Sequence, residues 1–173
     1  MTRVTLREKA GYLSDVVFAA SDGIVTTFAI VAGAAGASLE VRAVLVLGFA
    51  NLFADGFSMA SGNYLGVKSE IEFEKAKRVE ANGTGSPLKH GLFTFAAFNL
   101  AGFLPLIPFI FKINPPYVAS TIFVGLSLFV IGFIRSFYTK RGLVRSGIEM
   151  FTIGGFSSFI SFAIGFLIDR LLT

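Results

Sequence analysis

The chain has 173 residues, of which 54% are hydrophobic and only 15% are charged, and its mean hydropathy is +0.74. Because charged residues make up about a quarter of an ordinary soluble domain, this composition excludes a typical soluble fold and predicts an all-α, polytopic membrane protein. The absence of cysteine excludes disulfides, thiolate metal sites and thiol redox chemistry. With one histidine and no recognisable nucleotide or nucleophile motif, we expect neither an enzyme nor a bound cofactor.

Five apolar segments each have about the 20 residues that a helix needs to cross a bilayer. They are residues 16–37, 43–67, 91–111, 117–137 and 148–168. We expect them to form a single transmembrane domain, residues 1–173, with its two termini on opposite sides of the membrane.

The basic residues predict the orientation of this domain. All but three of the 15 lysines and arginines lie in the N-terminal segment or in the connections between spans two and three and between spans four and five; the exceptions are Arg42, Lys112 and Arg170. The positive-inside rule then predicts a cytosolic N-terminus and a C-terminus on the other side. The pI of about 9.6 is therefore a sign of topology, and we expect no nucleic-acid partner.

The first span carries Asp22 about six residues from its cytosolic end. This carboxylate is a candidate cation ligand, although a local hydrogen-bonding role beside Ser21 is the alternative. The connection to the second span is only about five residues long, which predicts that the two spans are antiparallel neighbours.

The second span combines an apolar composition with a regular polar stripe. Asn51, Asp55, Met59 and Asn63 recur every four residues, which places them on one face of a helix. A carboxylate in mid-bilayer costs about 2.5–3.5 kcal/mol, so Asp55 must face protein, water or a cation. A second stripe contains only small residues, which permit close helix contacts within the protomer or across a dimer; it consists of Ala54, Ser58, Gly62 and Gly66.

The second helix is expected to extend into the cytosol over residues 68–81 and to stop at a glycine- and proline-containing cluster, residues 82–87. Glu70 and Glu74 then stand at the cytosolic mouth, unless they form only a solvated helix face. In the third span, Pro105 and Pro108 predict a kink. We expect His90, which precedes that span, to be an ordinary interfacial residue.

Together these positions form a column of oxygen donors with one thioether. Asp22 and Met59 are expected at similar depth, with Asp55 about 6 Å further out and Asn51 another turn beyond. Carboxylate and amide oxygens with a thioether suit a transition metal better than Mg²⁺ or Ca²⁺. One protomer offers few ligands at any level, and a symmetric dimer would double them. A carboxylate can also exchange a metal ion for protons. The alternative is that these side chains only join helices.

Two segments resemble the first two spans of the vacuolar iron transporter family: SDGIVTTFAIVAGAAGA, residues 21–37, and GFANLFADGFSMASGNYLGVKSE, residues 48–70. Residues 86–109 and 145–167 agree with later parts of the same family. The resemblance implies five spans, a homodimer and proton-driven export of Fe²⁺, sometimes Mn²⁺, from the cytosol. It also implies that Asp22, Met59 and Glu70 match the family's translocation aspartate, its methionine and its KSE glutamate.

The chain departs from this family in two ways. Better-known eukaryotic members have a pathway glutamate at the position of Asn51 and a small residue at that of Asp55, which we interpret as a carboxylate moved along one face. They also carry a glutamate-rich metal-collecting domain between spans two and three, for which residues 69–89 are too short.

The sequence therefore predicts a homodimeric, lipid-embedded exporter of Fe²⁺ or Mn²⁺ that takes protons in exchange. Its metal ligands would be Asp22, Asp55 and Met59, with Asn51 on the exit side and Glu70 and Glu74 at the cytosolic mouth. We expect it in the plasma membrane of a prokaryote or in a vacuolar or other organelle membrane of a eukaryote. A passive divalent-cation channel, or a membrane scaffold or partner subunit that transports nothing, are the alternatives.

Overall fold

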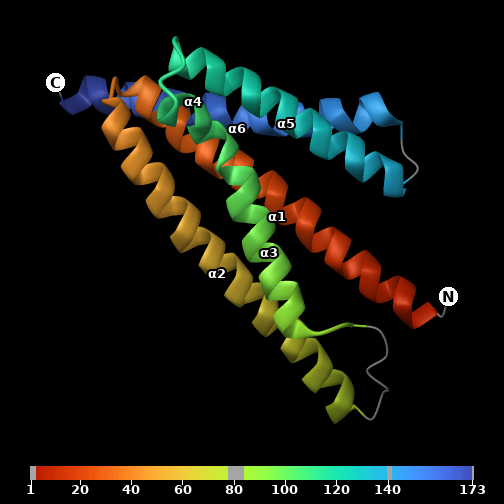
Figure 1. The fold of residues 1–173 in the computed structure, drawn as a ribbon. Coiled ribbons are helices and arrows are strands. Elements are labelled where there is room, and N and C mark those ends of the chain that lie inside the picture. The colour runs from red at the N-terminus through yellow and green to blue at the C-terminus, as the bar shows by residue number, and fades with distance from the viewer. Residues whose placement is uncertain (1–2, 78–83, 140–141, 173) are drawn as a thin grey trace.

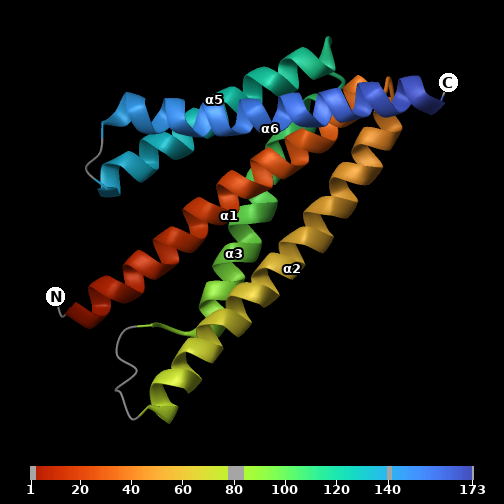
Figure 2. The same cartoon turned by 180° about the vertical axis from the view of Figure 1, so that it is seen from behind.

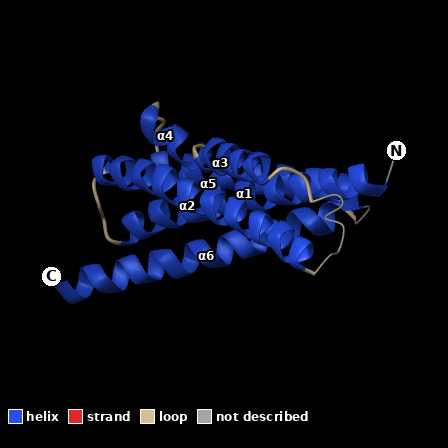
Figure 3. Cartoon of the chain, turned by 90° about the horizontal axis from the view of Figure 1, so that it is seen from below, coloured by secondary structure: helices blue, strands red, loops and turns tan. Residues whose placement is uncertain are grey.

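The computed structural model describes residues 3–77, 84–139 and 142–172, which are helical with short connections and contain no strand (Figures 1 and 3). The helices are α1 Arg3–Gly36, α2 Val41–Ala76, α3 Pro87–Gly102, α4 Ile107–Ile110, α5 Pro116–Thr139 and α6 Leu143–Leu172, with the 3-10 turn η1 at Leu104–Leu106. Five stretches of these residues are long and apolar enough to span a membrane, and each overlaps an expected segment. The prediction of five transmembrane helices is confirmed.

Proline chemistry explains how the third crossing is built. Pro87 starts α3, where its missing N–H costs nothing because the first turn of a helix leaves that donor unpaired. Pro105 and Pro108 then interrupt regular α-helical hydrogen bonding, so the crossing continues as η1 and the short α4. The expected break in the outer half of this span is therefore observed.

The helix α2 continues beyond the membrane-length segment that the sequence predicts. It runs past Val67 to Ala76, and Lys77 leaves helical geometry. Residues 78–81, which complete the expected cytosolic extension, lie outside the described residues. The described part of the extension carries both Glu70 and Glu74.

Helix α3 lies between α1 and α2, which diverge from their short connection at residues 37–40 (Figures 1 and 2). The first two helices are antiparallel, as predicted, but α3 separates them over much of their length. Helix α6 packs against α1 and α5 and runs along one side of the bundle (Figure 3). The start of α1 and the C-terminal ends of α2 and α5 share one end, here called the N-terminal end of the bundle, and the C-terminal end of α6 lies at the opposite end (Figure 1).

The buried core is small compared with the apolar surface. Phe98 of α3 is fully buried and packs with Ile24, Leu106 and Leu128 in one cluster. Large apolar side chains on α6, such as Phe156 and Phe159, are each 68% exposed. Such exposure suits a helix whose solvent is lipid, because hydrocarbon tails replace the protein core as the apolar environment.

Two glycines bring α3 against both of its neighbours. A Cβ added at Gly23 of α1 would collide with the backbone carbonyl oxygen of Phe98. A Cβ at Gly56 of α2 would lie 2.5 Å from Nδ2 of Asn99 and 3.2 Å from a ring carbon of Phe98. The helices can therefore approach this closely only because both positions lack a side chain.

Gly23→Ala is expected to destabilise the bundle by about 1–3 kcal/mol, because the methyl group meets α3 backbone, which cannot rotate out of the way as a side chain can. Circular dichroism melts in detergent would show a lower unfolding temperature. Gly155→Ala on α6 is the matched control, since an added Cβ there meets nothing within 4 Å. Equal unfolding temperatures of the two variants would contradict the close packing of α3 between α1 and α2.

Candidate functional site

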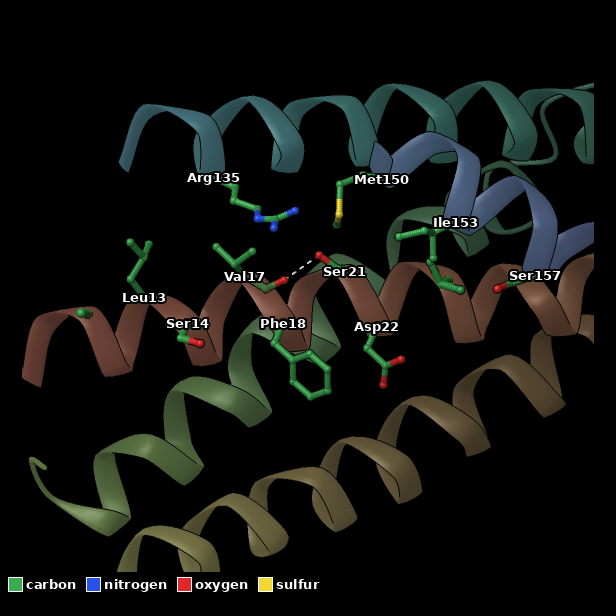
Figure 4. A pocket seen from close by; sticks show the side chains of 12 residues that line it. Leu13, Ser14, Val17, Phe18, Ser21, Asp22, Arg135, Met150, Ile153 and Ser157 are labelled. Carbon is green, nitrogen blue, oxygen red and sulfur yellow. Dashed lines mark hydrogen bonds between the residues drawn. The ribbon is translucent and has the colours of Figure 1, made fainter. Parts of the chain in front are cut away.

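Asp22 lies in the middle of α1 and its side chain points toward α2 (Figure 4). It is half-buried, and Asp55 of α2 is close enough for the two charges to interact. The sequence places Asp55 about one helical turn further out than Asp22, and in the structure the two charges are near enough to interact. Their role as metal ligands remains a prediction.

The local sequence is the same at both aspartates. Asp22 precedes Gly23 and Asp55 precedes Gly56, and both glycines seat α3. Consecutive residues of a helix point about 100° apart. Because each aspartate directly precedes a glycine that contacts α3, its carboxylate lies beside this contact and not inside it. The packing of Phe98 against these glycines therefore determines the distance between the two aspartates.

The polar stripe of α2 forms the border between the core and the outer surface. All four members of this stripe are half-buried: Asn51, Asp55, Met59 and Asn63. Met59 packs against the core cluster, and Asn63 donates to Oγ1 of Thr94 on α3 at 2.7 Å. Nδ2 of Asn51 is buried without a hydrogen-bond partner. Asn63 thus joins helices, whereas the Asn51 amide still has a donor available.

The two glutamates lie far from the aspartates. Glu70 is 15 residues beyond Asp55 on the same helix, a separation of about 22 Å along its axis. Arg7 of α1 binds Glu70 at 3.0 Å and approaches Glu74 at 3.9 Å, and Oε2 of Glu74 is buried without a hydrogen-bond partner. Glu70 and Glu74 therefore form a separate acidic group at the N-terminal end of the bundle.

Asp22 also lines a cavity of about 740 Å³ between α1, α5 and α6 (Figure 4). Most of its lining is apolar, with polar atoms from Ser21, Ser157 and Arg135 and the thioether of Met150. Ser21 donates to the carbonyl oxygen of Val17 and Arg135 pairs with Glu149 at 3.6 Å. Asp22 is consequently reachable from this cavity on one side and faces Asp55 on the other.

Within the described residues, one copy of the chain brings no three carboxylate, imidazole or thiolate side chains together as a metal cluster. A complete coordination sphere would require further donors, such as amide oxygens, a thioether, water or a second copy.

The expectation that His90 is an ordinary interfacial residue is wrong. Only 4% of its surface is exposed, and Nδ1 of its ring contacts the carboxylate of Asp15 of α1. The missed signal is a spacing of four in α3: of its five buried residues, all but Gly91 follow this spacing, namely His90, Thr94, Phe98 and Gly102. A residue on the stripe that contains Phe98 faces the core even at the start of the helix.

These features define a class of protein: a polytopic α-helical membrane protein with two interacting acidic side chains in the middle of two of its spans, as in proteins that move ions across bilayers. The sequence matches the VIT family over residues 13–83 and 78–166, and the chain belongs to that family.

Individual relatives agree with this assignment. Vacuolar iron transporter homolog 2 of Arabidopsis thaliana is 24% identical over 95% of this chain and 86% of its own length. Vacuolar iron transporter 1 of the same plant is 25% identical over 90% of this chain and 86% of its own length. A vacuolar iron transporter of Toxoplasma gondii is 48% identical, but the match covers only 39% of this chain and 22% of that protein.

Asp55→Asn is expected to raise the unfolding temperature of the metal-free protein by about 3 °C, or about 1 kcal/mol at this size, because it removes repulsion from Asp22. With excess Mn²⁺ the order should reverse, since only the wild type keeps both carboxylates for the cation. Thermal melts with Mn²⁺ or a chelator measure both effects. A variant that gains as much stability from Mn²⁺ as the wild type would exclude Asp55 from the cation site.

Proposed function

We propose that this chain exports Fe²⁺ or Mn²⁺ from the cytosol in exchange for protons, through a site that contains Asp22, Asp55 and Met59. The observation that carries the proposal is that two carboxylates, in the middle parts of the membrane-length helices α1 and α2, are near enough for their charges to interact. The names of the relatives support iron as the cargo. The distribution of basic residues supports a cytosolic N-terminal end.

Electrostatics favour a cation over a purely structural role for the pair. One carboxylate can be accommodated in a bundle by a hydrogen bond, but two adjacent carboxylates repel each other at low dielectric. A divalent ion or protons neutralise the pair, and the two compete for the same oxygens. That competition is the physical basis for exchanging metal against protons.

The thioether is proposed to set metal preference. Met59 lies one helical turn from Asp55, on the same stripe of α2. A sulfur donor adds affinity for transition metals and little for Mg²⁺ or Ca²⁺. Asn51, one turn to the other side of Asp55 and with an unpartnered amide group, is the proposed next contact on the exit side.

A second copy of the chain is proposed to complete the site. The small-residue stripe of α2 is exposed at all four positions, and a Cβ added at Gly62 or Gly66 would meet nothing within 4 Å. This stripe lies beside the polar stripe. A second copy that packs on the small-residue stripe would therefore bring its own ligands to the polar stripe. The charge of Glu70 and Glu74 would attract cations to the mouth of this path, where the metal competes with Arg7.

The decisive experiment is metal flux into proteoliposomes. We expect Fe²⁺ or Mn²⁺ to move against its own gradient when a pH gradient is imposed, and Asp22→Ala to lower the rate at least about tenfold, as loss of a direct ligand does. Glu72→Ala is the control, because that carboxylate is exposed on the same helix. Flux that only follows the metal gradient would favour a channel, and no flux together with no stabilisation by metal would favour a scaffold.

Gly62→Phe is expected to weaken dimerisation by at least about tenfold, because an aromatic ring keeps two α2 backbones apart. Light scattering of the purified protein measures the mass, and circular dichroism checks that the protomer remains helical. The same substitution at Gly155, which also has free space around it, should leave the dimer intact. Dissociation by Gly155→Phe alone would place the interface on α6.

A further inference from the structure

The chain's single histidine lies in a polar cluster at the N-terminal end of the bundle, apart from the proposed metal path. His90 is buried in the first turn of α3 and faces α1 and residues 84–86, which lead into α3. A Cβ added at Gly11 of α1 would lie 3.0 Å from Cε1 of its ring. The imidazole therefore fills a tight space between two helices and a connection.

Both ring nitrogens of His90 face acceptors. Nδ1 bonds to the carboxylate of Asp15, and Nε2 lies 2.8 Å from the backbone carbonyl oxygen of Thr84. A carbonyl oxygen cannot donate, so the contact with Thr84 requires a proton on Nε2, and an ionised Asp15 requires one on Nδ1. The arrangement of acceptors therefore suits an imidazolium that bridges α1 and residues 84–86.

The same cluster holds the connection in a second way. The Tyr12 ring lies 4.4 Å from the His90 ring, and its hydroxyl donates to Glu8 and accepts from the backbone N–H of Ser86, each at 3.1 Å. Gly85 between these contacts has a φ of +77°, where a side chain would be strained and would also meet the Tyr12 hydroxyl. Residues 84–86 are therefore fitted closely onto α1.

We propose that His90 is a proton-binding site that fastens residues 84–86 to α1 when it is protonated and releases them when it loses one proton. The remaining proton stays on Nδ1, where the carboxylate accepts it in a charge-assisted bond. The proton from Nε2 passes to water, and the Nε2 lone pair then faces the lone pairs of the Thr84 carbonyl oxygen. That repulsion replaces a hydrogen bond and loosens the connection.

Several other ionisable groups lie near the imidazole, but none of them is a side chain that ordinarily changes charge near neutral pH. They are Glu8, Tyr12 and Asp15 from α1, Tyr64 from α2 beside Gly91, and the exposed Lys89 from α3 itself. Imidazole is the ordinary side chain that changes charge between about pH 5 and 8. The proposal goes beyond metal export and depends on neither the cargo nor the dimer.

Nitrogen NMR of histidine-labelled protein tests the charge state directly, because one histidine gives one pair of ring signals. We expect both nitrogens to be protonated at the lower pH of a titration and Nε2 alone to lose its proton as the pH is raised. A neutral ring at the lower pH, or loss of the Nδ1 proton instead, would overturn the proposal. This measurement needs no variant.

The release of the connection can be followed in the same range. Because the chain has no cysteine, Thr84→Cys provides a single thiol and keeps the backbone carbonyl. Its maleimide labelling rate, divided by that of Ser69→Cys on the exposed face of α2, should rise about tenfold from low to high pH, as loss of one charge-assisted bond predicts. The ratio cancels the ionisation of the thiol itself.

His90→Gln in the Thr84→Cys background should make this ratio independent of pH, because an amide does not titrate there. A ratio that still rises with pH in the Gln variant would assign the release to another group. A ratio that stays constant in the histidine-containing protein would show that the connection is not fastened by the ring.

Discussion

The close seating of α3 between α1 and α2 is the constraint on which the rest of the structure depends. Phe98 is fully buried where Gly23 and Gly56 admit the α3 backbone and the Asn99 amide. In lipid there is little hydrophobic force between helices, so their association relies on such close contacts. Each glycine follows an aspartate, and the contact that holds the helices therefore also determines the spacing of Asp22 and Asp55.

The remainder of the surface is consistent with lipid on some faces and protein on others. Large apolar side chains cover α6, which suits acyl chains, whereas α2 exposes a stripe without large side chains from Ala54 to Gly66. A small-residue face exposed to lipid gains few dispersion contacts, while another helix backbone can fit closely against it. The half-buried polar stripe beside it would then be enclosed by the second copy, which is where a cation could lose its water.

Much of this arrangement could be predicted from the sequence, because it depends on local composition and periodicity. The five spans and the break caused by Pro105 and Pro108 follow from segment length and proline chemistry. The position of α3 between α1 and α2 does not, since it depends on contacts between residues that are distant in sequence. The burial of His90 differs from the expectation for the same reason: the fold brings its partners Asp15 and Thr84 to it.

The two polar regions of the molecule are connected through bonds that do not titrate. Asn63, the last member of the polar stripe, donates to Thr94, and the Thr94 hydroxyl donates to the backbone carbonyl of His90. Neither bond uses the imidazole, so a change in the charge of the ring leaves the α2–α3 register intact. The contacts that do involve the ring lead only to α1 and to residues 84–86. Loss of a proton from the ring would therefore release residues 84–86 while the helices that carry Asp55 and Met59 keep their packing.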